Sequence, residues 1–102
     1  MKPLPKTWKI LSVDYVVITD KDDPETVNKQ LEDGDVGGVS HRRHEIYIRA
    51  CGIPLAGQWA ALIHETKEVL NERLRIDEEK HENIDRFDAG WLTVMLDNGF
   101  LD

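Results

Sequence analysis

Cysteine is almost missing from this chain of 102 residues, which has a single one, Cys51. A lone cysteine cannot form an intrachain disulfide, and it excludes a metal site built from thiolates alone. We expect Cys51 to be a small buried residue rather than a nucleophile. Long apolar runs are missing as well, so we expect neither a signal peptide nor a membrane span. These shortages predict a cytoplasmic protein.

Basic residues are also in short supply, because 13 Lys and Arg stand against 20 Asp and Glu. The resulting formal charge of -7 argues against sequence-independent binding to nucleic acid, which depends on neutralising phosphates with Lys and Arg. A protein or peptide partner of neutral or basic character fits this charge better. Nothing in the sequence predicts the oligomeric state.

Apolar residues nevertheless make up 40% of the chain, which is typical of a folded globular protein. A chain of this length has the size of one compact domain, so we interpret residues 1–102 as a single domain. The three tryptophans, which are the largest apolar side chains, are expected to anchor its core. They are Trp8, Trp59 and Trp91.

Three segments have the composition of β-strands. Residues 7–19 are rich in β-branched and aromatic side chains, which predicts one strand. Residues 36–40 follow a glycine-containing turn and are expected to pair with residues 45–50 in a hairpin, with the polar stretch 41–44 as its connection. Together they predict a small antiparallel sheet of about three strands.

Helical patterns fill most of the remaining chain. Asp23 is placed to cap a short helix over 25–32, with Pro24 at the first helical position. Apolar residues then recur at three- and four-residue steps over 55–74 and again over 81–98, where Gly99 is a suitable C-terminal stop. The predicted fold class is therefore α+β, with the sheet packed on two main helices.

The most informative motif lies in helix 55–74, where the sequence reads His64-Glu65-Thr66-Lys67-Glu68. It matches the zinc helix His-Glu-x-x-His of metallopeptidases, except that glutamate replaces the second histidine. In the intact motif two histidines four apart bind zinc from one helix face, and the glutamate beside the first acts as general base on a metal-bound water. The flanking residues are apolar, so we expect His64 and Glu68 to be largely buried. The alternative interpretation is a charged, solvated helix face.

With this motif, the chain resembles the short phage-encoded zincin-like metallopeptidases, distant relatives of the ImmA/IrrE group. The resemblance rests on the helical motif and on the order of the segments around it. These segments are Gly37-Gly38-Val39-Ser40, Glu45-Ile46-Tyr47-Ile48, Leu62 to Glu68, and Ile84 to Gly99. The resemblance spans most of the chain. It implies a zincin-like fold and, for a phage-encoded member, action in the cytoplasm of the host cell.

The resemblance also implies a zinc site. In it His64 is the first ligand, Glu68 is the second ligand, and Glu65 is the catalytic general base. An acidic residue of the last helix would be the third ligand, with the candidates ranked Glu82, Asp85 and Asp88.

Glutamate at position 68 changes the expected chemistry. A carboxylate binds zinc, but its extra negative charge weakens the Lewis acidity of the metal toward a bound water. We therefore expect an altered metallopeptidase site whose activity is reduced or lost. An imidazole from His41, His44 or His81 is a further candidate to replace the missing ligand.

A function of another class fits the same sequence. An acidic protein of this size could be a non-enzymatic binding module that inhibits a host factor or a defence system. In that case His64 and Glu68 would serve structure alone. Zinc binding separates the two hypotheses.

Overall fold

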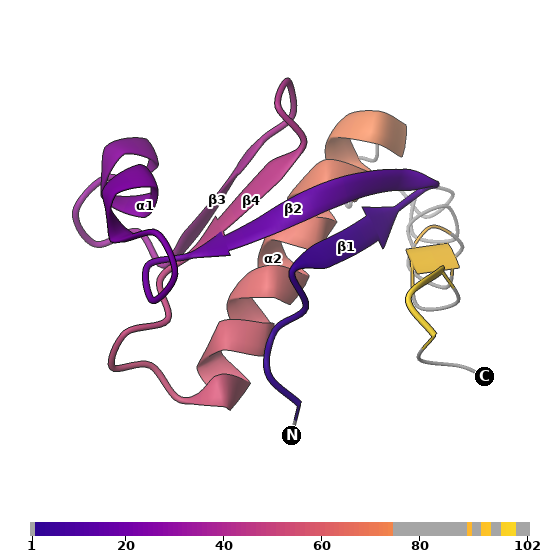
Figure 1. Ribbon diagram of the computed structural model, residues 1–102. Helices are drawn as coiled ribbons and strands as arrows, with labels where there is room; N and C mark the ends of the chain where they lie inside the picture. Colours follow the sequence, from indigo (N-terminus) through magenta and orange to yellow (C-terminus); the bar gives the residue numbers. More distant parts are fainter. Residues whose placement is uncertain (1, 75–89, 91–92, 95–96, 100–102) are drawn as a thin grey trace.

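The computed structural model describes residues 2–74, 90, 93–94 and 97–99. Within this part, the strands and helices follow one another in the order β1 (Thr7–Ile10), β2 (Val13–Thr19), α1 (Pro24–Gln30), β3 (Gly37–Ser40), β4 (Glu45–Ile48) and α2 (Leu55–Leu74). The fold is α+β, as the sequence predicts, with a four-stranded sheet in the order β1-β2-β4-β3 (Figure 1). None of the helices in the described part is long and apolar enough to cross a membrane.

The single strand predicted over residues 7–19 is wrong, because two antiparallel strands occupy this segment. Ile10 of β1 pairs with Val13 of β2, and Leu11 and Ser12 alone form the turn between them. Their φ angles are 50° and 68°, in the left-handed region that glycine and asparagine usually occupy in such two-residue turns. Residues typical of this turn are absent, so the strand signal runs through it unbroken.

The sheet is mixed rather than purely antiparallel. The hairpin of β3 and β4 is confirmed, with Gly37 opposite Ile48 and Ser40 opposite Glu45. Strand β4, however, also pairs in parallel with β2. Parallel neighbours need a long crossover, and α1 together with β3 provides one between β2 and β4. The predicted count of about three strands becomes four.

Helix α1 begins as the sequence predicts. The Asp23 carboxylate accepts hydrogen bonds from Thr26 N at 3.1 Å and from Thr26 Oγ1 at 2.6 Å, which caps the first turn. Pro24 occupies the first helical position, where its missing N–H has no intrahelical acceptor to lose. The helix buries Val27 completely against the sheet.

Two apolar clusters hold the sheet between the helices. The larger lies on the α2 face and the smaller, built from Val27, Leu31, Tyr47 and Ile18, lies on the α1 face. Trp8 is buried in the larger cluster, and Trp59 packs against it with the two ring centroids 5.8 Å apart. The core position predicted for Trp8 is confirmed, and Trp59 lies partly buried against that core. Trp91 lies outside the described residues.

Most of the helix predicted over 81–98 lies outside the described residues. Of its described positions, Val94 is fully buried in the larger cluster. Asn98 binds the outer edge of β1, since its Oδ1 accepts from Lys9 N at 3.0 Å and its Nδ2 donates to Lys9 O at 2.7 Å. These two hydrogen bonds fix Asn98 to the first strand of the sheet.

Candidate functional site

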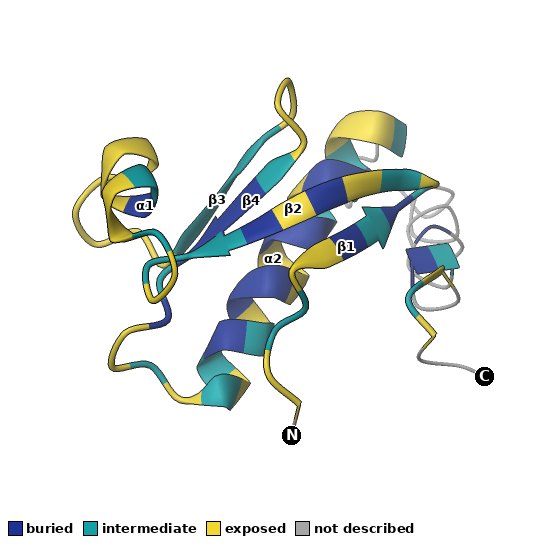
Figure 2. Ribbon diagram, in the orientation of Figure 1, coloured by how far each residue is buried: buried dark blue, intermediate teal, exposed yellow. Residues whose placement is uncertain are grey.

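Helix α2 presents one buried stripe to the sheet, and a charged residue lies within it (Figure 2). The buried residues of the helix recur at three- and four-residue steps and are Gln58, Ala61, Leu62, Glu65, Thr66, Val69 and Leu70. The side chain of Glu65 is therefore carried toward the sheet with its apolar neighbours. It is only 6% exposed.

His64 and Glu68 lie together on one flank of the same helix, as the motif predicts. His64 Nε2 and Glu68 Oε1 are 3.8 Å apart. Their expected burial is wrong, because the two side chains are 66% and 52% exposed. Each residue of an α-helix is rotated by about 100° from the last, and this rotation places the pair beside the buried stripe while Glu65 falls inside it.

Two glycines bring the edge strand β3 close to its neighbours on both faces. A Cβ atom at Gly37 would lie 3.2 Å from Glu65 Oε2 and 3.3 Å from Tyr47 O. A Cβ atom at Gly38, which points to the opposite face, would lie 2.7 Å from Leu31 Cδ2. The absence of both side chains lets Glu65 approach the strand from the α2 face and Leu31 from the α1 face.

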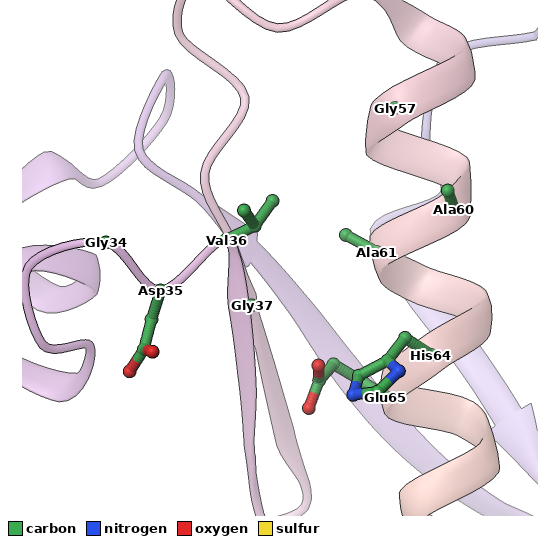
Figure 3. A pocket seen from close by; sticks show the side chains of 9 residues that line it. All are labelled: Gly34, Asp35, Val36, Gly37, Gly57, Ala60, Ala61, His64 and Glu65. Atoms are coloured by element: carbon green, nitrogen blue, oxygen red, sulfur yellow. The ribbon is translucent and has the colours of Figure 1, made fainter.

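A cleft of about 400 Å³ opens between the start of β3 and helix α2 (Figure 3). Gly34, Asp35 and Val36 form its rim on the loop that precedes β3. Most of the remaining lining residues are small, and they are Gly37, Gly57, Ala60, Ala61, His64 and Glu65. The Glu65 carboxylate extends from α2 toward β3.

The environment of Glu65 makes its ionised form less favourable than that of an exposed glutamate. Burial raises the pKa of its carboxyl above the usual value; the nearby His64 opposes this effect, and the negative charges of Glu68 and Asp35 add to it. Glu65 accepts no hydrogen bond from any residue that the structure describes. A carboxyl in this state can give and accept a proton at a pH closer to neutrality than an exposed glutamate.

Comparisons of the chain with protein-family models, with curated proteins and with solved structures find no match.

Hydrogen bonds from Arg49 stabilise the rim of the cleft. Its Nε donates to Asp35 O and its Nη1 donates to Asn28 Oδ1, both at 2.8 Å, and its backbone N donates to Val36 O at the same distance. The guanidinium thereby ties the loop before β3 to the end of β4 and to α1. Sequence reasoning missed this role, since an arginine directly after a strand gives no specific signal.

The geometry of His64 and Glu68 is compatible with zinc. Zinc bound to nitrogen and oxygen at about 2.0–2.2 Å in tetrahedral geometry holds two donor atoms about 3.3–3.5 Å apart. The observed 3.8 Å is close to this value, and both side chains are exposed enough to rotate. Within the described part of the chain, however, no group of three or more His, Cys, Asp or Glu could hold a metal. The candidate ligands Glu82, Asp85, Asp88 and His81 lie outside the described residues.

The other candidates from the sequence lie away from the cleft lining. His41 and His44 belong to the exposed connection of the β3–β4 hairpin, and the His44 ring lies 5.2 Å from that of Tyr15. Cys51 is exposed, contrary to the expectation of burial. Desolvation and the neighbouring Asp20 carboxylate raise the pKa of its thiol, which disfavours the reactive thiolate.

Proposed function

We propose that this protein is zincin-like and carries an altered metallopeptidase site at the cleft between β3 and α2. In this proposal His64 and Glu68 are zinc ligands, Glu65 is the proton-transfer group, and an acidic residue near the C-terminus, with Glu82 preferred, is the third ligand. The observation that carries the proposal is the arrangement on α2. Two donor atoms 3.8 Å apart lie beside a buried carboxyl whose pKa is raised.

Each residue would have a distinct task. Neutral His64 offers a ring nitrogen and Glu68 a carboxylate oxygen, while zinc, when bound, supplies Lewis acidity. Glu65 reaches the cleft from the buried stripe of the helix and is suited to accept a proton there. Because Glu68 adds a negative charge that histidine would not, we infer that peptidase activity is reduced or lost. Cytoplasmic action, for a phage-encoded protein in the host cell, is part of this proposal and is supported by the single cysteine.

Zinc titration of the metal-free full chain by calorimetry tests the proposal. We expect one zinc per chain, weaker binding by at least about tenfold in His64→Ala and in Glu68→Gln, and stronger binding in Glu68→His. Glu25→Gln, which removes an exposed carboxylate from α1, is the matched control and should bind zinc as the unmodified chain does. Failure of both the unmodified chain and Glu68→His to take up zinc would overturn the metal site.

The second candidate function is the acidic binding module, which the exposure of the site favours. His64 and Glu68 are mostly solvated, and Val36 and Ile63 are each 45% exposed although they are large and apolar. Of these two residues Val36 lines the cleft, and exposed apolar residues are typical of surfaces that contact a partner. The melting temperature separates the two functions. If it is unchanged by zinc, by chelator and by the His64→Ala substitution, the metal site is rejected and the binding module is the favoured function.

A further inference from the structure

The side chain of Glu65 is mostly buried, and it lines the cleft. Glu65 is 6% exposed and accepts no hydrogen bond from the described residues. A buried carboxylate is costly unless it is paired with a cation or hydrogen-bond donors. Among the residues that line the cleft, His64 alone can carry positive charge, and its side chain is 66% exposed. Asp35 at the rim adds a second negative group.

The small residues keep the space in front of this carboxylate open. Gly37 and Gly57 have no side chain, and Ala60 and Ala61 contribute only methyl groups, so a volume of about 400 Å³ remains (Figure 3). Val36 points across the cleft toward α2 and adds an apolar wall. The result is an open cleft in which small and apolar residues surround the Glu65 carboxyl group. Its shape and charge match an aliphatic stem that ends in a cation.

We propose that the cleft binds a guanidinium group on an aliphatic stem, as in an arginine side chain, with Glu65 as the buried partner and Asp35 as a second carboxylate at the rim. A guanidinium is more weakly hydrated than an ammonium, so it loses less on entering a confined site. Its planar donors also match a carboxylate in a two-pronged hydrogen-bonded pair. The formal charge of -7 attracts such a ligand from a distance.

This inference goes beyond the proposed function and does not depend on it, because no metal takes part in the binding. It is therefore tested by calorimetry on the full chain in the presence of EDTA. The probes are the capped peptide acetyl-Gly-Arg-Gly-amide and the same peptide with citrulline, which is the uncharged near-isostere of arginine. We expect the arginine peptide to bind at least about tenfold more tightly, since a charge-assisted hydrogen bond contributes about 1.5–3 kcal/mol and tenfold in affinity is 1.4 kcal/mol.

Three variants locate the binding. Glu65→Gln should weaken binding of the arginine peptide by at least about tenfold. Asp35→Asn should weaken it by only about two- to threefold, because this side chain is exposed and screened. Glu25→Gln removes an exposed carboxylate that does not belong to the cleft lining, and it should leave the affinity unchanged. A melting curve of each variant checks that it is folded.

Equal affinity for the arginine and citrulline peptides, no binding of either, or full binding by a folded Glu65→Gln variant would overturn the inference. Butylguanidinium, as a third probe, distinguishes the source of the group. Tighter binding of the peptide supports an arginine side chain, whereas equal binding supports a free small guanidinium compound. Zinc uptake with no peptide binding in EDTA would reject the guanidinium site and leave the metal site standing. Peptide binding in EDTA with no zinc uptake would reject the metal site and leave the guanidinium site standing.

Discussion

The indole Nε1–H of Trp8 donates a hydrogen bond of 3.0 Å to Thr66 Oγ1, and both residues are buried. Thr66 in turn donates to Leu62 O at 2.7 Å. This short chain of hydrogen bonds ties strand β1 to the middle of α2 across 58 positions of sequence. The position of the helix against the sheet, and hence of Glu65 against β3, depends on this contact.

Replacement of Thr66 by valine should destabilise the fold. Valine has the same shape but cannot accept the hydrogen bond, so the free energy of unfolding should fall by about 1–3 kcal/mol. Chemical denaturation of the variant checks the value. In a Trp8→Phe background, which has no indole N–H, the same replacement should cost about 1 kcal/mol less. Identical costs in both backgrounds would show that the hydrogen bond contributes nothing.

Replacement of Glu65 by glutamine should stabilise the metal-free protein. The raised pKa means that ionised Glu65 is disfavoured in the fold, and this penalty is complete only above its folded pKa. We expect a gain on the order of 1 kcal/mol at pH 8, measured by denaturation in EDTA. The gain should vanish below the usual carboxyl pKa of 4.5, where the group is protonated in both states. A loss of stability at pH 8 would contradict this account of the cleft.

Replacement of Gly37 by alanine should disturb the cleft as well as the fold. The new methyl group would meet Glu65 Oε2 at 3.2 Å and the backbone carbonyl of Tyr47 at 3.3 Å, and the carbonyl has little freedom to move. We expect a loss of about 1–3 kcal/mol in the free energy of unfolding. Gly34→Ala is the comparison variant. The φ of 93° at Gly34 strains alanine, but a methyl group there would meet nothing within 4 Å. Only Gly37→Ala should shift the resonances of the Glu65 side chain in NMR spectra.

Replacement of Asp20 by alanine should lower stability in a pH-dependent way. Partial burial alone would raise the pKa of Asp20, but hydrogen bonds from Ala50 N and Cys51 N outweigh it and lower the pKa below 3.8. The carboxylate therefore stabilises the fold fully above pH 3.8, and this contribution is lost as the pH falls through the lowered folded pKa. We expect a cost of about 1.5 kcal/mol at pH 7 that shrinks in strong acid, measured by denaturation at several pH values.

Asp22→Ala is the control for Asp20. Asp22 forms only an exposed ion pair with Lys6 at 3.8 Å, so its loss should change the free energy of unfolding by less than about 0.5 kcal/mol. An equal cost for the two variants, or a cost for Asp20→Ala that grows toward low pH, would contradict the prediction.

Local patterns predicted the local elements well. Asp23 and Pro24 mark the start of α1, and apolar spacing marks all of α2, because these signals depend on residues close in sequence. The β1–β2 turn was missed because Leu11 and Ser12 adopt positive φ without the residue types that normally signal it. The parallel pairing of β2 with β4 was missed because it joins segments separated by a helix and a strand.

The contrast between local patterns and long-range pairing also explains which parts of the candidate site could be predicted. Spacing alone predicted that His64 and Glu68 share a face, and the structure brings them together. The burial of Glu65 could have been predicted too, since it follows Leu62 by three positions and precedes Val69 by four, within the apolar period of the helix. Burial was predicted instead for His64 and Glu68, the two ligand positions of the motif. Asp35 and Gly37 join the cleft only through the fold of the sheet, which no short pattern in their sequence reveals.

The two outer strands of the sheet differ in what an incoming chain would meet. At β1 the Asn98 amide already occupies the N–H and C=O of Lys9, in the manner of a short additional strand. Strand β3 is the other outer strand, and within the described residues its one strand partner is β4. An incoming strand would therefore have to displace the Asn98 amide from Lys9 to pair along β1, whereas no described strand covers the outer edge of β3. One asparagine thus shields part of one edge of this sheet from a foreign strand.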